Sequence, residues 1–237
     1  MRKNAFLKAP LDRRLTAAAD FVRPGAVFAD IGTDHAYLPV FLAEKGVIKR
    51  AIAADINRGP IERAAANIAA SGYSDIIKTC QTDGLVGLEC EGVTDIAICG
   101  MGGELIARII ESAEFTRDRS VRLILQPMTK AESLRDFLIN NGFAVIGEKL
   151  AKEDKVYQII CAEFTGENST YTDAELYLGR FNIESKDPLL SELAEGVLAF
   201  FEKKRQGKAT AGMDTDYEDR MISLLKEIIN EIRPSDE

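Results

Sequence analysis

The amino-acid sequence predicts an α/β protein, in which a doubly wound, Rossmann-like parallel sheet ends in a β-hairpin and is followed by a small all-helical hairpin. Two patterns support this class. Short apolar runs alternate with segments of helical spacing over residues 1–165, and from about Thr170 onward only helical spacing remains. The chain has 237 residues, of which 46% are hydrophobic, which is enough for one α/β domain and a small appendage. We therefore predict two domains, residues 1–165 and residues 170–237.

Charge and cysteine content exclude several classes of function. The net charge of −8 argues against a broadly basic nucleic-acid-binding protein, although it leaves room for a local basic patch. The four cysteines lack the spacing of metal ligands and the chain has one histidine, so no metal site is expected. Apolar neighbours predict reduced, buried thiols. No segment resembles a signal peptide or a membrane span, so we expect a cytoplasmic protein.

The first element is expected to be a basic helix within residues 4–22, with Pro10 as a possible start. Its basic residues, with those that flank it, are Arg2, Lys3, Lys8, Arg13, Arg14 and Arg23. This helix can present a solvated face, or it can contact a phosphate or carboxylate beside the first strand. The residues alone leave both interpretations open.

The segment from Val27 to Pro39 organises the rest of the chain. Residues 26–31 form an apolar run typical of a buried parallel strand, and Gly32 ends it and allows backbone to approach a ligand. Because proline has no N–H, Pro39 fits a helix only in its first turn. We therefore expect the helix to start near Asp34 or His35, with Asp34 as its N-cap.

The glycine and acid content of this turn favours one kind of ligand. A dinucleotide needs close backbone approach at the several glycines of Gly-x-Gly-x-x-Gly, and this turn has one, Gly32. Asp30 and Asp34 would repel phosphate and attract a cation. S-adenosylmethionine carries an ammonium and a sulfonium group and no phosphate, so the turn favours it. The alternative is that both acids only cap the helix.

Beyond the first turn, strands and helices are expected to alternate in the order of a doubly wound sheet. The expected strands are residues 50–54, 76–82, 95–99, 121–125, 143–150 and 156–164. The expected helices are residues 37–45, 58–71, 104–112 and 131–140. The charged connector at residues 152–155 makes the last two strands an antiparallel hairpin.

Two more acids follow the second and third strands. Asp55 lies close to the spacing of about 20 residues from Gly32 at which an acid accepts from an adenosine ribose. Asp83, followed by Gly84, can accept from the exocyclic amine of adenine. Taken alone, such an aspartate is most often a turn residue. In series with Asp30 and Asp55, the ligand interpretation is favoured.

The fourth and fifth strands are followed by Gly100-Met101-Gly102-Gly103 and by Gln126-Pro127-Met128. Three glycines in four positions are costly in chain entropy. They are expected where backbone lies close to a substrate or presents N–H groups at a helix start.

The C-terminal part is predicted to be two long antiparallel helices. Apolar residues recur at helical spacing from Leu189 to Phe201 and again within residues 216–233, and residues 207–216 connect the two runs. A basic cluster lies near the connector: Lys203, Lys204, Arg205 and Lys208. It can complement the dipole at the helix end, which we slightly prefer, or contact a nucleic-acid backbone.

Four segments taken together resemble the bacterial tRNA adenine-22 N1-methyltransferase family. They are Asp30-Ile-Gly32-Thr-Asp34-His35-Ala36-Tyr37-Leu38-Pro39, Gly59-Pro60, Ile98-Cys-Gly100-Met-Gly102-Gly103 and Leu123-Ile-Leu-Gln126-Pro127. The likeness covers about residues 10–165, and the helical tail is similar to that family's coiled-coil-like C-terminal domain. The resemblance implies a class I methyltransferase fold, S-adenosylmethionine as the methyl donor, and N1 of an adenosine in the tRNA D-arm as the acceptor.

The resemblance places Arg14, Asp30, Gly32, Asp34, His35, Asp55, Asp83 and Gly100 at the donor site. Together with the residue patterns, it leads to the following expected roles. The expected cofactor-binding residues are Arg14, Asp30, Gly32, Asp34, Asp55, Asp83, Gly84 and Gly100. The expected substrate-binding residues are Tyr37, Met101, Gly102, Gly103, Gln126 and Pro127. Asp34 and His35 are the expected catalytic residues. Family members often have a larger acid at the position of Asp55, and many have asparagine at the position of Met128.

The expected chemistry is an in-line methyl transfer in which the protein positions the acceptor and arranges charge. Adenine N1 has a free lone pair at neutral pH, so no strong base is needed. Asp34 is expected to stabilise the cationic product. His35 is catalytic or a structural hydrogen-bonding residue, and Tyr37 stacks on the target base or packs in the core.

The target base must be exposed, so we expect the helical tail and the basic N-terminal helix to dock tRNA, and we expect a monomer. Three alternatives remain at this point. They are a methyltransferase for a small molecule or protein, a non-enzymatic nucleotide-binding module, and an NAD-dependent oxidoreductase.

Overall fold

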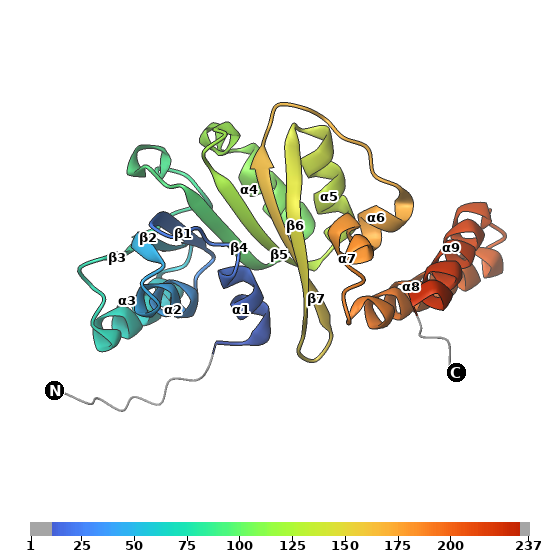
Figure 1. The fold of residues 1–237 in the computed structure, drawn as a ribbon, viewed down its shortest axis with the longest axis horizontal. Helices are drawn as coiled ribbons and strands as arrows, with labels where there is room; N and C mark the ends of the chain where they lie inside the picture. The colour runs from blue at the N-terminus through green and yellow to red at the C-terminus, as the bar shows by residue number, and fades with distance from the viewer. Residues whose placement is uncertain (1–10, 233–237) are drawn as a thin grey trace.

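The computed structural model describes residues 11–232. The predicted helix start before Pro10, the basic residues Arg2, Lys3 and Lys8, and the predicted helix end at Arg233 lie outside these residues. Within them, the strands form one seven-stranded sheet in the order β3-β2-β1-β4-β5-β7-β6 (Figure 1). Strand β7 runs antiparallel to both of its neighbours, and the other neighbouring strands are parallel. The predicted doubly wound sheet with a terminal hairpin is therefore present.

The strands follow the predicted order with small differences at their ends. They are β1 (Ala26–Ile31), β2 (Ile48–Asp55), β3 (Ile77–Gln81), β4 (Asp95–Gly102), β5 (Arg122–Thr129), β6 (Phe143–Lys152) and β7 (Val156–Phe164). The helices beside the sheet are α1 (Arg13–Ala19), α2 (Tyr37–Glu44), α3 (Arg58–Ser71), α4 (Gly103–Glu111) and α5 (Ala131–Asn140). Two short 3-10 turns are η1 (Glu89–Glu91) and η2 (Glu114–Arg117).

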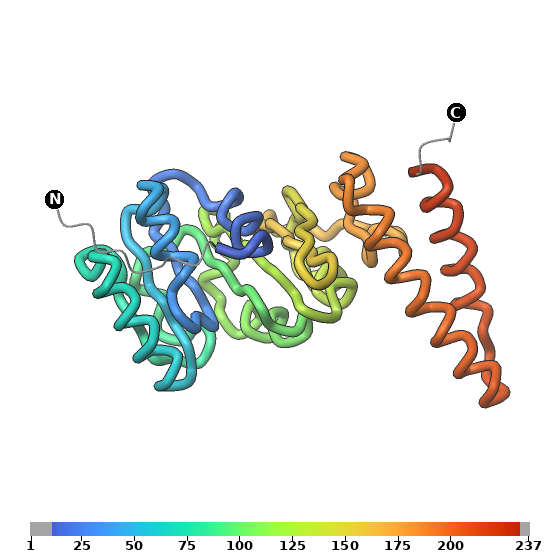
Figure 2. Tube along the Cα trace, turned by 90° about the horizontal axis from the view of Figure 1, so that it is seen from below, coloured from blue at the N-terminus to red at the C-terminus, as the bar shows by residue number. Residues whose placement is uncertain are grey.

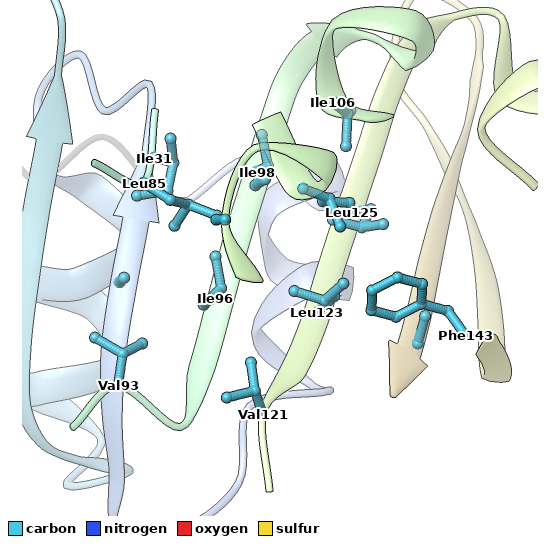
Figure 3. Close-up of a cluster of buried hydrophobic side chains, with 14 of the residues drawn as sticks. Ile31, Leu85, Val93, Ile96, Ile98, Ile106, Val121, Leu123, Leu125 and Phe143 are labelled. Atoms are coloured by element: carbon cyan, nitrogen blue, oxygen red, sulfur yellow. The ribbon is translucent and has the colours of Figure 1, made fainter. Parts of the chain in front are cut away.

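Alternation along the strands divides the core between two faces of the sheet. In β1, Phe28 packs with the apolar side chains of α1, α2 and α3, whereas Ala29 and Ile31 pack with those of α4 and α5. Figure 3 shows the second of these clusters, to which β4 contributes Ile96 and Ile98 and α4 contributes Ile106. Both faces of the central strands are buried, which is why β1 and β4 are continuous apolar runs.

Strands β4 and β5 continue beyond their predicted ends. We expected β4 to stop at Cys99, but it extends to Gly102 because it continues to pair with β5 after a shift in register. Met101 pairs with Pro127, and Gly102 pairs with Thr129. The glycine-rich segment is therefore an irregular strand end that leads directly into α4, and not an open loop.

The C-terminal part contains the predicted helical hairpin and two shorter helices that sequence patterning missed. The helices are α6 (Asp173–Leu178), α7 (Arg180–Glu184), α8 (Leu190–Thr210) and α9 (Asp216–Ile232). Figure 2 shows α8 and α9 side by side, extending away from the sheet. Phe201, Met221 and Leu225 are fully buried between them.

A buried ion pair joins α6 and α7 to the sheet. The Arg135 Nε atom donates to Glu148 at 2.7 Å, and neither side chain is exposed to solvent. Arg135 also donates to the carbonyl oxygen of Leu176 in α6, and Glu148 accepts from the backbone N–H of Phe181 in α7. These contacts attach α6 and α7 to the sheet. The predicted division of the chain at residues 165–170 stays a prediction.

The basic cluster of the tail is largely paired with acids of α9. Lys204 and Lys208 contact the two carboxylate oxygens of the buried Glu218, at 3.1 Å and 2.7 Å, and Arg205 contacts Asp219. Neither of our two interpretations anticipated this. The cluster serves mainly to hold α8 against α9, which leaves less of its charge for an external anion.

Candidate active site

The turn between β1 and α2 differs from its prediction in one respect. Helix α2 begins at Tyr37, and its N-cap is Ala36 in the left-handed conformation, with φ of 53°. The prediction that Asp34 caps the helix was therefore wrong. The Thr33 hydroxyl accepts from the Ala36 N–H at 3.1 Å, which stabilises a turn that L-residues rarely adopt. Pro39 still falls in the first turn of the helix, as its missing N–H requires.

Asp34 does not cap α2, and its exposed side chain lies between a guanidinium group and an imidazole ring. Its Oδ1 atom accepts from the Arg63 Nε of α3 at 2.9 Å, and Arg63 Nη2 contacts the same oxygen. Its Oδ2 atom lies 3.5 Å from His35 Nε2. Asn67, one turn after Arg63, donates to the His35 carbonyl oxygen at 2.7 Å. Helix α3 therefore holds both residues of the turn that sequence patterning proposed as catalytic.

His35 and Tyr37 form a stacked aromatic pair at the same turn. Their ring centroids are 5.0 Å apart and the rings are inclined by 16°. Tyr37 is 48% exposed, although large apolar and aromatic side chains are mostly buried in this chain. An exposed aromatic face beside a carboxylate is suited to a flat, hydrogen-bonding ligand such as a base.

A cavity of about 360 Å³ opens beside this turn. Predicted site residues that line it are Arg14, Asp30, Gly32, Asp34, His35, Tyr37 and Gly100. They come from α1, from the carboxyl ends of β1 and β4, and from the start of α2. In open α/β sheets ligands bind at this position, outside the carboxyl ends of the strands.

Asp30 is the most perturbed carboxyl group of the cavity. Its side chain follows the alternation of β1 and is 7% exposed. Burial raises the pKa of Asp30 from 3.8 to about 6, and a hydrogen bond from the Thr33 hydroxyl opposes that rise in part. Within residues 11–232, no basic side chain forms an ion pair with Asp30. A buried carboxylate without a cationic partner at the end of a central strand is a candidate cation-binding group.

Arg14, Gln126 and Gly100 form a network behind the cavity. Arg14 Nη1 donates to Gln126 Oε1 at 2.6 Å, and the Gly100 N–H donates to the same oxygen at 3.1 Å. Gln126 Nε2 donates to the Pro127 carbonyl oxygen at 2.9 Å. Gln126 is fully buried, and protein groups already occupy both ends of its amide. The network therefore fixes Arg14 relative to the ends of β4 and β5.

The basic residues beside the first strand have separate functions. Arg14 lines the cavity, whereas Arg23 donates to the buried carboxylate of Asp95 at the opposite end of β4. Neither interpretation anticipated the ion pair of Arg23, and a contact of Arg14 with a phosphate or carboxylate stays a prediction.

Asp55, Asp83 and Gly84 lie along the same sheet edge but outside the lining of the cavity. The Gly32 N–H donates to the Ala54 carbonyl oxygen, which places the end of β2 directly beside the turn after β1. The Thr82 N–H donates to the Asp55 carbonyl oxygen, which continues the edge to β3. The acids therefore follow one another along neighbouring strand ends.

Two exposed apolar side chains on this edge were not anticipated. Ile56 directly follows Asp55 and is 55% exposed, and Val86 lies three residues after Asp83 and is 62% exposed. Exposed branched apolar residues beside acids offer apolar contact surface to a base. The sequence signal that could have identified them is their position within three residues after the strand-end acids.

Met101 and Gly103 have packing roles next to the cavity. The Met101 methyl group lies over Gly32, so that a Cβ at position 32 would collide with it. A Cβ at Gly103 would collide with the Lys130 carbonyl oxygen at the start of α5. Gly102 is the N-cap of α4. Close packing of backbone therefore accounts for Gly103, and contact of residues 101–103 with substrate stays a prediction.

Two kinds of feature are absent from the part of the chain that the structure describes. Residues 11–232 contain no group of three or more metal-ligating side chains that could hold an ion. None of the helices within this range is long and apolar enough to cross a bilayer.

Comparison with known proteins agrees with this geometry. A family model described as a methyltransferase domain matches residues 11–160. The tRNA (adenine(22)-N(1))-methyltransferase of Bacillus subtilis (strain 168) is 37% identical over 170 residues, which make up 71% of this chain and 71% of that protein. The chain belongs to the tRNA (adenine(22)-N(1))-methyltransferase family.

Solved structures of the family superpose on nearly the whole chain. The B. subtilis m1A22 tRNA methyltransferase TrmK has a TM-score of 0.78 and 31% identity, over 94% of this chain and 98% of that one. Sp1610 of Streptococcus pneumoniae, in complex with S-adenosyl-L-methionine, has a TM-score of 0.82 and 32% identity, over 92% of this chain and 99% of that one. The family and the fold class predicted from the sequence are therefore confirmed.

Proposed function

We propose that this chain transfers a methyl group from S-adenosyl-L-methionine to N1 of adenosine 22 in the D-arm of tRNA. The B. subtilis relative is a tRNA (adenine(22)-N(1))-methyltransferase, and the S. pneumoniae relative binds S-adenosyl-L-methionine. In this chain, the observation that carries the proposal is the buried carboxylate of Asp30, which has no ion pair among residues 11–232 and lies in a cavity that Asp34 and Tyr37 also line. This cavity combines a site for a cation with an exposed surface for a base.

The residues of the sheet edge fit the donor. Asp30 would hold the ammonium group, because a positive charge compensates the desolvation of its carboxylate. Arg14 would pair with the carboxylate of the donor's amino-acid part, and Asp55 would accept from the ribose hydroxyls. Asp83 would accept from the adenine amino group, between the exposed side chains of Ile56 and Val86.

When bound, S-adenosyl-L-methionine supplies a methyl group activated by the positive charge of its sulfur. Asp34 would stabilise the positive charge that develops on the adenine ring as N1 shares its lone pair with the methyl carbon. It can also accept a hydrogen bond from the N6 amino group. Arg63 keeps the carboxylate of Asp34 oriented, and the stacked His35 and Tyr37 rings would present an aromatic surface to the base.

Gln126 would act through the groups that it holds. Its Oε1 atom accepts from Arg14 and Gly100, and its amide nitrogen donates to Pro127. Reading the target base would require Gln126 to break one of these buried hydrogen bonds, at a cost of about 1–3 kcal/mol. We therefore propose that Gln126 positions Arg14 and the end of β4, and that Asp34 meets the base.

A methylation assay with defined tRNA tests the function. Purified protein, labelled S-adenosyl-L-methionine and an unmodified tRNA transcript should give one N1-methyladenosine at position 22, located by primer extension. A transcript with guanosine at position 22 is the matched control and should accept no label. Methylation of both transcripts would contradict the proposal. Methylation of neither transcript, together with labelling of a free nucleoside or a protein, would also contradict it.

The contribution of the tail to tRNA docking needs a truncation that keeps the sheet intact. Removal of every residue from 170 onward would strip α6 and α7 from the buried pair of Arg135 and Glu148. A chain that ends after α7 retains both helices and removes only α8 and α9. We expect this variant to bind the donor with wild-type affinity and to methylate tRNA at least tenfold more slowly. Wild-type activity of the folded truncation would exclude docking by the tail.

A further inference from the structure

We infer that a second cavity, beside the one described above, is a subsite for the base of a nucleotide adjacent to the target adenosine. This inference rests on the proposed function. The cavity has a volume of about 130 Å³ and lies among the end of β5, the start of α5, the β6–β7 hairpin and the tail. Its walls include Met128, Lys130, Glu132, Lys155, Tyr157 and Tyr177.

Contacts of Arg14 connect the linings of the two cavities. Arg14 lines the first cavity, and its Nη1 atom lies 3.9 Å from the sulfur of Met128, which lines the second. The guanidinium group of Arg14 also lies over the ring of Tyr157, 5.7 Å from its centroid. Neighbouring nucleotides of one strand are joined by a single phosphodiester. Two cavities whose linings meet at Arg14, Met128 and Tyr157 therefore match a target base and its neighbour in a strand whose bases are splayed apart.

The size and chemistry of the second cavity suit a single base. The volume of about 130 Å³ is close to the about 150 Å³ of an engineered protein cavity that binds benzene, so the cavity is of the size class of a single aromatic ring. Tyr157, Tyr177 and Val197 provide aromatic and apolar contact surface. The carboxylate of Glu132 can accept from an amino or imino N–H of a base. These elements, an apolar wall and one oriented acceptor, are typical of base-binding pockets.

Two lysines at the rim are placed to meet the phosphate that links the two nucleotides. Lys155 Nζ donates to the Met128 carbonyl oxygen at 3.0 Å and lies over the Tyr157 ring, 5.0 Å from its centroid. Lys130 is 55% exposed, and its nearest acid, Glu132, lies 3.8 Å from its Nζ atom. By contrast, Lys204 and Lys208 of the tail are bound to the buried Glu218. Of these four lysines, the two beside the cavities therefore have no ion pair with a buried acid.

The test combines two changes in the protein with abasic substitutions in the tRNA. Lys130→Ala with Lys155→Ala removes the cations, and Val197→Phe fills the cavity without a change of charge. Lys78→Ala, at an exposed position of β3 on the opposite edge of the sheet, is the matched control. Each full-length variant is assayed for donor affinity by calorimetry, and for KM and kcat on tRNA with and without an abasic nucleotide immediately 5′ or 3′ of position 22.

We expect the double lysine variant to raise KM for tRNA about tenfold, with kcat changed less than twofold and donor affinity unchanged. The slope of log KM against log salt should decrease by about 1.4, since each lost contact to a single strand contributes about 0.7. An abasic nucleotide on one side of position 22 should raise KM for tRNA of the wild-type protein about tenfold. The same abasic tRNA should not raise the KM of Val197→Phe above its value for intact tRNA.

Three results would overturn the subsite. Unchanged KM in both variants, with an active wild-type protein, refutes the inference and leaves the proposed function standing. An altered salt slope with no effect of either abasic neighbour shows a phosphate contact without a base pocket. Failure of the wild-type protein to methylate any tRNA, while it binds the donor, overturns the proposed function and the subsite together.

Discussion

Replacement of Asp30 by asparagine should make the donor-free protein more stable and should weaken its affinity for the donor. The carboxylate of Asp30 is 7% exposed, and burial raises its pKa from 3.8 to about 6. Between these pH values the folded state binds more protons than the unfolded state. Stability therefore falls as the pH rises through this window, and the full cost is present above about pH 6.

The size of the effect follows from the two pKa values. At about 1.4 kcal/mol per pH unit, the rise from 3.8 to about 6 corresponds to about 3 kcal/mol. Asparagine has nearly the same shape and carries no charge, so Asp30→Asn should recover up to this amount at pH 8 and almost none near pH 4. In a chain of this length, about 3 kcal/mol corresponds to a rise of about 6–12 °C in Tm.

Thermal unfolding at pH 4.5 and pH 8, with calorimetric titration of S-adenosyl-L-methionine at pH 8, measures both effects. Loss of a charge-assisted contact of about 1.5–3 kcal/mol should weaken donor binding by about 10- to 100-fold. Asp34→Asn is the matched control. The Asp34 side chain is 60% exposed, so the Tm of this variant should differ little from that of the wild-type protein at either pH. The reasoning is refuted if Asp30→Asn has a lower Tm than the wild-type protein at pH 8, or an equal shift at both pH values.

Three further substitutions test other parts of the structure. Arg135→Met should lower the free energy of unfolding by about 3–5 kcal/mol in urea denaturation, because it leaves the buried carboxylate of Glu148 without a cationic partner. A small loss would show that the pair is hydrated. Gly103→Ala should cost about 1–3 kcal/mol, since its Cβ would collide with a backbone carbonyl. Its control, Gly196→Ala in α8, meets no atom within 4 Å and should stabilise by about 0.5–1 kcal/mol, so equal Tm shifts would contradict this account. Arg63→Met should change the free energy of unfolding by less than about 1 kcal/mol, because the ion pair of Arg63 with Asp34 is exposed. The same variant should lower kcat for tRNA methylation about tenfold with donor affinity unchanged. A parallel loss of donor binding would show that Arg63 supports the fold of the whole site.

Local patterning predicted much of the fold because parallel strands buried on both faces are continuous apolar runs. The alternation of such runs with helical spacing identified β1, α3 and β7 almost residue by residue. It missed α6 and α7, which are six and five residues long, because helices this short are stabilised by tertiary contacts and not by their own periodicity. Arg135 and Glu148 supply some of these contacts from elements far away in the chain.

The candidate site was only partly accessible from the sequence. Acids that follow successive parallel strands must share one edge of the sheet, so the sequence alone predicts that Asp30 and Asp55 lie near each other. The cap at Ala36 could not be predicted, because alanine carries no signal for a left-handed conformation. The contacts of Arg63 and Asn67 could not be predicted either. Solvated arginines and asparagines on helices are common, and the partners of these two residues lie about thirty residues away.

The sequence by itself determined the fold class, the family and the line of carboxylates along the sheet edge, because these depend on periodicity and on which residue ends each strand. Only the tertiary structure decided that Asp34 is held by α3, that Gln126 supports Arg14, and that Lys155 lies beside a second cavity. It also paired the lysines of the tail with Glu218. These arrangements depend on distances between side chains that are remote in sequence, which packing of the whole chain sets and local pattern does not encode.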